Sequence, residues 1–88
     1  MLEKTIEQAL CKRVKELGGS CDKYSSPSRR AVPDRIVMLP NKTLIFVECK
    51  APGKAPTDAQ YRDHERRRAM GFDVRVISTL EQVNAFPN

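Results

Sequence analysis

The chain of 88 residues is 40% apolar, which is enough for the core of one compact domain, residues 1–88, and leaves no room for a second. Sixteen Lys and Arg residues against eleven Asp and Glu residues give a net charge of +5, which favours an anionic partner, first of all nucleic acid, although it also serves solubility. The chain has three scattered cysteines without C-x-x-C spacing, which argues against a disulfide framework and a zinc site and indicates an intracellular, cytoplasmic protein. No apolar run is long enough for a membrane segment.

The first predicted element is an amphipathic helix over residues 2–17, followed by the helix-stopping pair Gly18-Gly19. Glu7 lies at the edge of its apolar stripe, where a carboxylate can face either solvent or a site beneath the helix. The apolar positions that define the stripe are Leu2, Ile6, Ala9, Leu10, Val14 and Leu17.

A short strand is expected at residues 20–24, and a polar, turn-rich loop at 25–30 follows it. This loop ends in Arg29 and Arg30, shortly before the Pro33-Asp34 step. An anion bound near Asp34 would lie within reach of both guanidinium groups, although solvation alone also accounts for two adjacent loop arginines.

Residues 32–50 contain most of the chemically informative side chains. Two strands, 35–39 and 43–49, are predicted here with a turn between them, and the second is apolar on both faces, as in the middle of a covered sheet. Glu48 and Lys50 project from the same side of that strand, and the hairpin brings Asp34 close to both. Two carboxylates that can share a divalent cation thus lie beside an ammonium group; the alternative is a plain Glu–Lys ion pair at the sheet edge.

The loop at 51–56 holds Lys54, which could touch a phosphate, and Thr57 then begins a helix with the capping-box pattern T-x-x-Q. The capping box is by itself a structural explanation for a glutamine at position 60. It also places Gln60 in the first turn of the helix, beside the end of the strand that carries Glu48. That helix, at 58–70, is rich in arginine and predicts a surface that follows nucleic-acid phosphates, or else a solvated face balanced by its acids. His64 has no partner at ligand spacing and is expected at the surface. The arginines of the helix are Arg62, Arg66, Arg67 and Arg68.

A last strand at 73–78 and a short helix at 80–86 complete the chain. The order is therefore helix, three strands, helix, strand, helix. We expect an α/β fold in which a small mixed sheet is flanked by helices.

In this order, Pro33-Asp34 and Glu48-Cys49-Lys50 resemble the PD-(D/E)xK nuclease superfamily, whose core is restriction-endonuclease-like. The segment A-P-G-K-A-P-T-D-A-Q and the basic R-R-A-V before P-D are similar specifically to the VRR-NUC family, in its minimal stand-alone, virus-type form. The resemblance runs from about residue 7 to residue 77. It implies a hydrolase of phosphodiester bonds in DNA.

The resemblance also implies a role for each residue of the motif. Asp34 and Glu48 would bind Mg²⁺ or Mn²⁺ together with the backbone carbonyl of Cys49, and Lys50 would orient water or stabilise charge. Gln60 matches the glutamine of the helix after the motif. Glu7 would hold a metal-bound water as the acid of the first helix, with Glu3 as the alternative. The residues expected to contact nucleic acid are Arg29, Arg30, Lys54, Arg62, Arg66 and Arg67.

The expected function is a metal-dependent, structure-selective DNA endonuclease, acting on branched DNA such as four-way (Holliday) junctions. A small domain with one active centre cuts one strand, so a cut across a symmetric branch requires a homodimer. The resemblance also suggests a phage-encoded protein that acts in a bacterial host. The alternative function is a basic nucleic-acid-binding module without catalysis, in which Asp34, Glu48 and Lys50 form an ion-paired sheet end.

Overall fold

The structure is a computed structural model that describes all 88 residues. The predicted order of elements is confirmed, and the bounds of the second and third strands are those expected from the sequence. In chain order the elements are α1 (Glu3–Glu16), β1 (Ser20–Lys23), β2 (Arg35–Leu39), β3 (Thr43–Cys49), α2 (Asp58–Ala69), β4 (Asp73–Ile77) and α3 (Leu80–Ala85).

The four strands form one mixed sheet in the order β1-β2-β3-β4. Strand β2 pairs antiparallel to both β1 and β3, whereas β4 pairs parallel to β3 after the crossover through α2. Strand β3 is therefore an inner strand, as its two apolar faces predict. Its parallel pairing with β4 brings the C-terminal ends of these two strands to the same edge of the sheet.

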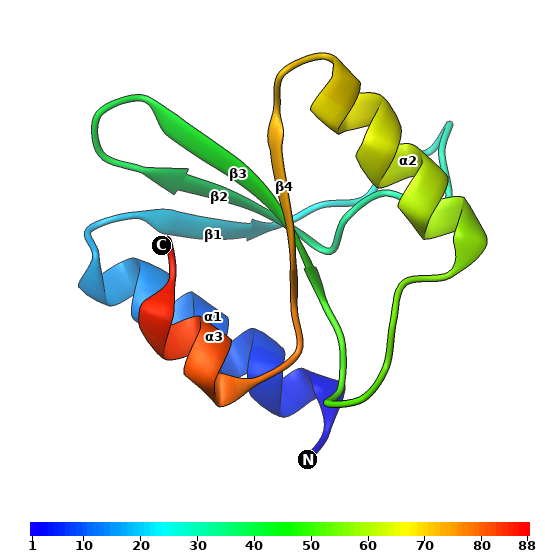
Figure 1. Cartoon of the computed structure of the whole chain (residues 1–88). Coiled ribbons are helices and arrows are strands. Elements are labelled where there is room, and N and C mark those ends of the chain that lie inside the picture. Colours follow the sequence, from blue (N-terminus) through cyan, green and yellow to red (C-terminus); the bar gives the residue numbers. More distant parts are fainter.

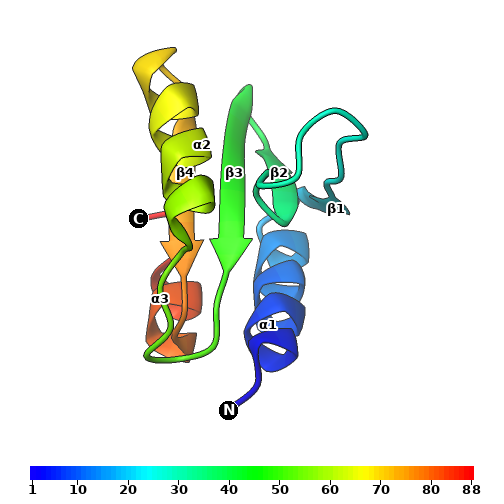
Figure 2. The same cartoon turned by 90° about the vertical axis from the view of Figure 1, so that its right-hand side faces the viewer.

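Helices α1 and α3 cover one face of the sheet and α2 lies against the other (Figures 1 and 2). The main core lies on the face of α1 and α3, because the helical spacing of α1 buries three apolar residues against alternate strand positions. The core cluster contains Ile6, Leu10, Val14, Val37, Ile45, Val47, Cys49, Ile77, Val83 and Phe86. This face supplies most of the hydrophobic stabilisation.

The end of α1 explains why two glycines follow it. Gly18 has φ +83°, a left-handed conformation that favours glycine after a helix. At Gly19 a Cβ atom would lie 2.4 Å from the carbonyl oxygen of Met38, so a side chain there would push α1 away from β2. The pair therefore both ends the helix and lets the chain turn closely into β1.

Helix α2 has no apolar stripe, and it packs on the second face of the sheet through polar side chains. Arg67 is only 7% exposed, its Nε donates to Asp63 at 2.8 Å, and its guanidinium lies over the rings of Tyr24 and Phe46, 5.2 and 4.7 Å from their centroids. The prediction that Arg67 belongs to a phosphate-following surface is therefore wrong. A buried, paired and stacked guanidinium is a packing group here.

His64 is also buried in this layer, so the prediction of a surface histidine is wrong. Its side chain is fully shielded from solvent, and neither ring nitrogen has a hydrogen-bond partner. Burial, with the charge of Arg68 next in importance, lowers the pKa of His64, which keeps the imidazole neutral. The error arose because spacing within α2 alone does not show which face of this arginine-rich helix meets the sheet.

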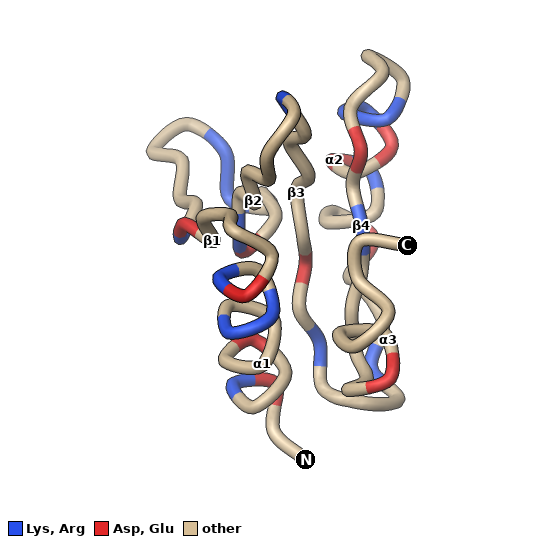
Figure 3. The backbone as a smooth tube through the Cα atoms, turned by 90° about the vertical axis from the view of Figure 1, so that its left-hand side faces the viewer, with Lys and Arg blue, Asp and Glu red and all other residues tan.

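Charged residues cluster on α1 and α2 and in the loop between β1 and β2 (Figure 3). Along β3 the chain is uncharged from Thr43 to Val47, and one acidic and one basic position follow near its C-terminal end. The helices of this fold are too short and too polar to cross a bilayer.

Candidate active centre and adjoining basic cleft

Asp34 is fixed at the entrance to β2 by a bond to the neighbouring strand. Its Oδ2 atom accepts a hydrogen bond of 2.8 Å from the backbone N–H of Cys49, and its own carbonyl oxygen accepts one of 2.9 Å from Tyr24 N–H. The first bond ties the carboxylate to the C-terminal end of β3, where Glu48 lies. The sequence prediction that the hairpin brings Asp34 to this end of β3 is thus met by the geometry.

Glu48 lies at the centre of a small polar cluster although it is only 2% exposed. Its Oε2 atom lies 3.3 Å from Lys50 Nζ and accepts a hydrogen bond of 3.2 Å from Gln60 Nε2. Its other oxygen, Oε1, is buried and accepts no hydrogen bond. A buried carboxylate oxygen without a partner is costly for the fold and is available to bind a cation.

The charges around Glu48 favour an added cation. The pKa of Glu48 is raised to about 7, chiefly by burial and next by the Asp34 carboxylate, whereas Lys50 acts in the opposite direction. One ammonium group therefore does not offset both the desolvation of Glu48 and its repulsion by Asp34. A divalent cation bound between the two acids would stabilise both in the ionised form.

Gln60 performs two functions with the two ends of its amide. Its Oε1 accepts from the backbone N–H of Thr57 at 2.9 Å, while Thr57 Oγ1 accepts from the backbone N–H of Gln60 at 3.2 Å. The predicted capping box is therefore present. Because Oε1 is used in the cap, the amide nitrogen is directed to Glu48. The start of α2 is thus coupled to the candidate centre.

Glu7 belongs to α1 and therefore lies on the other side of the sheet from Gln60. Its Oε1 pairs with Arg35 Nε at 2.7 Å, and it makes no hydrogen bond or ion pair with Asp34, Glu48 or Lys50. Glu7 and the alternative acid Glu3 both line a surface cavity of about 390 Å³ with Arg35 on its wall. The role of Glu7 toward a metal-bound water stays a prediction.

Arg35 is the residue near this centre that the sequence analysis did not single out. It follows Asp34 directly and lies opposite Val47, so its side chain is on the apolar face of the sheet, next to α1. A charged residue at an apolar position of a strand could have indicated a buried ion pair, because a partly buried guanidinium needs partners. Arg35 donates one hydrogen bond to Glu7 and another to the carbonyl oxygen of Cys21.

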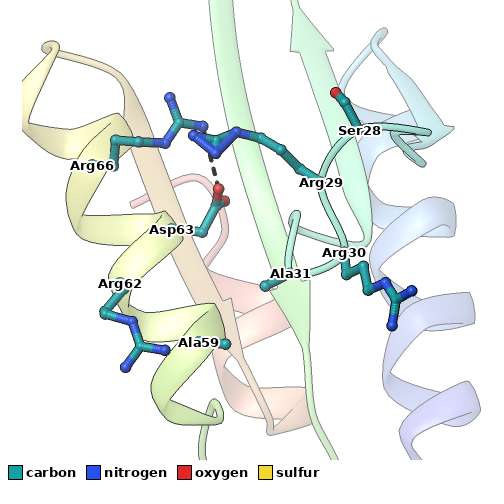
Figure 4. A pocket seen from close by; sticks show the side chains of 8 residues that line it. All are labelled: Ser28, Arg29, Arg30, Ala31, Ala59, Arg62, Asp63 and Arg66. Atoms are coloured by element: carbon teal, nitrogen blue, oxygen red, sulfur yellow. Dashed lines mark hydrogen bonds and ion pairs between the residues drawn. The ribbon is translucent and has the colours of Figure 1, made fainter.

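A basic cleft of about 320 Å³ lies between the loop after β1 and the side of α2 that faces this loop (Figure 4). Arg29 extends across the cleft toward Arg66 and Asp63, whereas Arg30 points away from α2. Lys54 belongs to the loop before α2 and lies outside the cleft, exposed to solvent. The lining consists of Ser28, Arg29, Arg30, Ala31, Ala59, Arg62, Asp63 and Arg66.

Comparison with known proteins finds strong similarity in both sequence and structure. The chain is 47% identical over 85 residues to "Putative nuclease p44" of Acyrthosiphon pisum secondary endosymbiont phage 1, covering 97% of this chain and 91% of the relative. A solved structure described as "VRR_NUC domain" superposes with a TM-score of 0.89 at 34% identity, covering 94% of this chain and 90% of that one. No protein-family model matches the chain.

Proposed function

Since this chain belongs to the VRR-NUC family of nucleases, we propose that it is a metal-dependent, structure-selective DNA endonuclease whose centre is formed by Asp34, Glu48, Lys50 and Gln60. The observation that carries the proposal is the state of Glu48. It is buried beside a second carboxylate, and one of its oxygens has no partner in the protein. Such an arrangement fits a cation better than it fits a packing role.

The proposed cofactor is Mg²⁺ or Mn²⁺, held by Asp34, Glu48 and the backbone carbonyl of Cys49. Hard divalent cations prefer such oxygen ligands. When bound, the cation would supply positive charge to the phosphodiester and lower the pKa of water. The Cys49 amide, by donating to Asp34, holds the first acid toward the second.

The other residues of the centre would position water and offset charge. Lys50 Nζ lies 3.3 Å from Glu48, so it is held where it can orient the attacking water or stabilise the negative charge that develops on the phosphate. Gln60 keeps Glu48 Oε2 occupied, which leaves Oε1 free for the cation. Glu7 would hold a water molecule from the α1 side.

We propose branched DNA, such as a four-way junction, as the substrate and a homodimer as the active form. One domain provides one centre and cuts one strand, whereas a symmetric junction presents two equivalent strands. The phage relative supports a role inside an infected bacterial cell. Light scattering after gel filtration should give the mass of a dimer at micromolar concentration, and a monomer alone would contradict this part of the proposal.

The test is a panel of four-way, flap and linear DNA incubated with Mg²⁺, Mn²⁺ or EDTA. We expect cleavage of branched DNA with either metal and none in EDTA. Asp34→Ala and Lys50→Ala should each reduce the cleavage rate by at least about a hundredfold, as expected for loss of a charged catalytic group. Cleavage that survives both substitutions would contradict the proposed centre.

The same panel distinguishes the non-catalytic alternative. The Glu48–Lys50 ion pair is also what a purely structural sheet end would show. A binding module would bind the DNA molecules of the panel with an affinity that falls as salt rises, but it would yield no product with any metal. Product formation that depends on metal excludes it.

A further inference from the structure

The basic cleft has more positive charge than its own acids can balance. Four arginines and one aspartate line it, which leaves a net charge of +3. That aspartate, Asp63, is already shared between Arg66 at 3.2 Å and the buried Arg67 at 2.8 Å. Arg29 and Arg62 have no carboxylate partner anywhere in the protein, and both are exposed. Concentrated, unbalanced guanidinium groups on the walls of a cleft favour an anion.

Two connections place the cleft next to the candidate centre. Ala31, on the loop wall, precedes Asp34 by three residues, and the hydrogen bond from Tyr24 N–H to the Asp34 carbonyl closes the base of that loop. Ala59, on the helix wall, is adjacent to Gln60, which contacts Glu48. A strand whose scissile phosphate lies at Glu48 therefore passes close to the mouth of the cleft.

The chemistry of the lining selects phosphate groups rather than bases. The only apolar residues on the walls are Ala31 and Ala59, and no aromatic ring is present on which a base could stack. The volume of about 320 Å³ is that of a small-molecule pocket, too small for a duplex and large enough for one or two sugar–phosphate units.

We propose that this cleft is a strand-binding site that holds the sugar–phosphate backbone of a single DNA strand, one or two nucleotides from the scissile bond, through Arg29, Arg62 and Arg66. It reads charge and not sequence, because phosphate contacts carry no base information. The inference rests on the proposed nuclease function for its meaning. Arg67 has no part in it, since its guanidinium is buried and engaged by Asp63.

The test measures binding in EDTA, where a metal-dependent enzyme cuts nothing. The probes are three fluorescent oligonucleotides of equal length: single-stranded DNA, an abasic strand and a strand with an uncharged methylphosphonate backbone. The natural and abasic strands should bind within a few-fold of each other, and the methylphosphonate strand should not bind measurably. For three single-strand phosphate contacts, the affinity should fall roughly twentyfold between 50 and 200 mM salt.

Variants assign the effect to the cleft. Arg29→Ala, Arg62→Ala and Arg66→Ala should each reduce the slope of log affinity against log salt by about 0.7. Lys12→Ala, which removes an exposed positive charge from α1 on the opposite face of the sheet, should keep the full slope. Circular dichroism of each variant checks that the fold is retained.

The outcomes separate this inference from the proposed function. Asp34→Ala should keep the full salt slope with single-stranded DNA, because the three arginines are intact, although it is expected to cut nothing. An unchanged salt slope in all three arginine variants, or an abasic strand that binds as poorly as the methylphosphonate strand, would overturn the strand-binding site. If the unmodified protein binds the strand as predicted but cleaves no DNA with any metal, only the proposed nuclease function is contradicted.

Discussion

At the scale of single residues, the account depends on how Glu48 is held. Lys50 and Gln60 both reach the same oxygen, Oε2, and leave Oε1 buried without a partner. A folded protein keeps such a group only when another requirement outweighs the cost of its desolvation. A bound cation would satisfy that oxygen, which would connect the burial of one side chain to the chemistry proposed for the whole protein.

His64 gives a prediction about pH at the same scale. Its folded pKa lies below the ordinary value of 6.5, chiefly through burial, with Arg68, Arg67 and Lys50 acting in the same direction and Asp63 against them. The stability that a neutral His64 contributes is thus complete above pH 6.5 and is lost as the pH falls through the folded pKa. We expect His64→Leu to be increasingly stabilised relative to the unmodified protein between pH 7 and pH 5.

The measurement is urea unfolding of both proteins at several pH values. The comparison isolates His64 because it is the one histidine of the chain and because Glu48, which titrates in the same range with opposite sign, is present in both proteins. A stability difference that stays constant over this range would show that the imidazole does not change its protonation on unfolding.

At the scale of elements, α2 is the unusual part of the molecule. It contacts the sheet through Asp63, His64 and Arg67 instead of an apolar stripe, and its first turn joins the candidate centre through Gln60. It also carries two of the four arginines of the basic cleft, Arg62 and Arg66. One helix therefore combines packing on the sheet with positioning of the candidate carboxylate Glu48 and with part of the proposed DNA-binding surface.

The two adjacent arginines of α2 should separate stability from binding. Arg67→Ala removes a buried partner of Asp63 and a stacked cation, and should lower the free energy of unfolding by about 3 kcal/mol. Arg66→Ala, whose side chain is 40% exposed, should lower it by less than about 1 kcal/mol while it weakens DNA binding. Equal losses in chemical denaturation would contradict the assignment of Arg67 to packing.

The capping boxes of α2 and α3 offer a matched pair. Thr57→Ala and Thr79→Ala each remove a side-chain cap, and each should lower the free energy of unfolding by about 1 kcal/mol. Only the first loosens the turn that holds Gln60 against Glu48. Cleavage rates at saturating metal should therefore fall several-fold for Thr57→Ala and stay unchanged for Thr79→Ala, and equal effects on cleavage would argue against a positioning role for that turn.

The elements themselves were largely predictable from sequence because their signals are local. The apolar runs of β2 and β3, the glycines after α1 and the T-x-x-Q pattern before α2 each depend on neighbouring residues. The burial of His64 and Arg67 was not predictable in this way. For Arg67 it depends on the rings of Tyr24 and Phe46, which are far from α2 in sequence and are brought to it by the sheet.

At the scale of the whole molecule, the chain divides its work between the two faces of one sheet. The apolar core with α1 and α3 stabilises the domain on one side, and the polar face under α2 carries the candidate centre and adjoins the cleft (Figure 1). The triad Asp34, Glu48 and Lys50 could be predicted because the hairpin fixes its register. The Glu7–Arg35 pair could not, since it needs the packing of α1 on β2.

The most direct measurement of the central claim is calorimetric titration of Mn²⁺ into the protein and its variants without DNA. We predict saturable binding to the unmodified protein, loss of that binding in Asp34→Asn and Glu48→Gln, and its retention in Lys50→Ala, because the first two remove ligands and the third removes a competing positive charge. Binding of Mn²⁺ to Glu48→Gln as tight as to the unmodified protein would contradict the account.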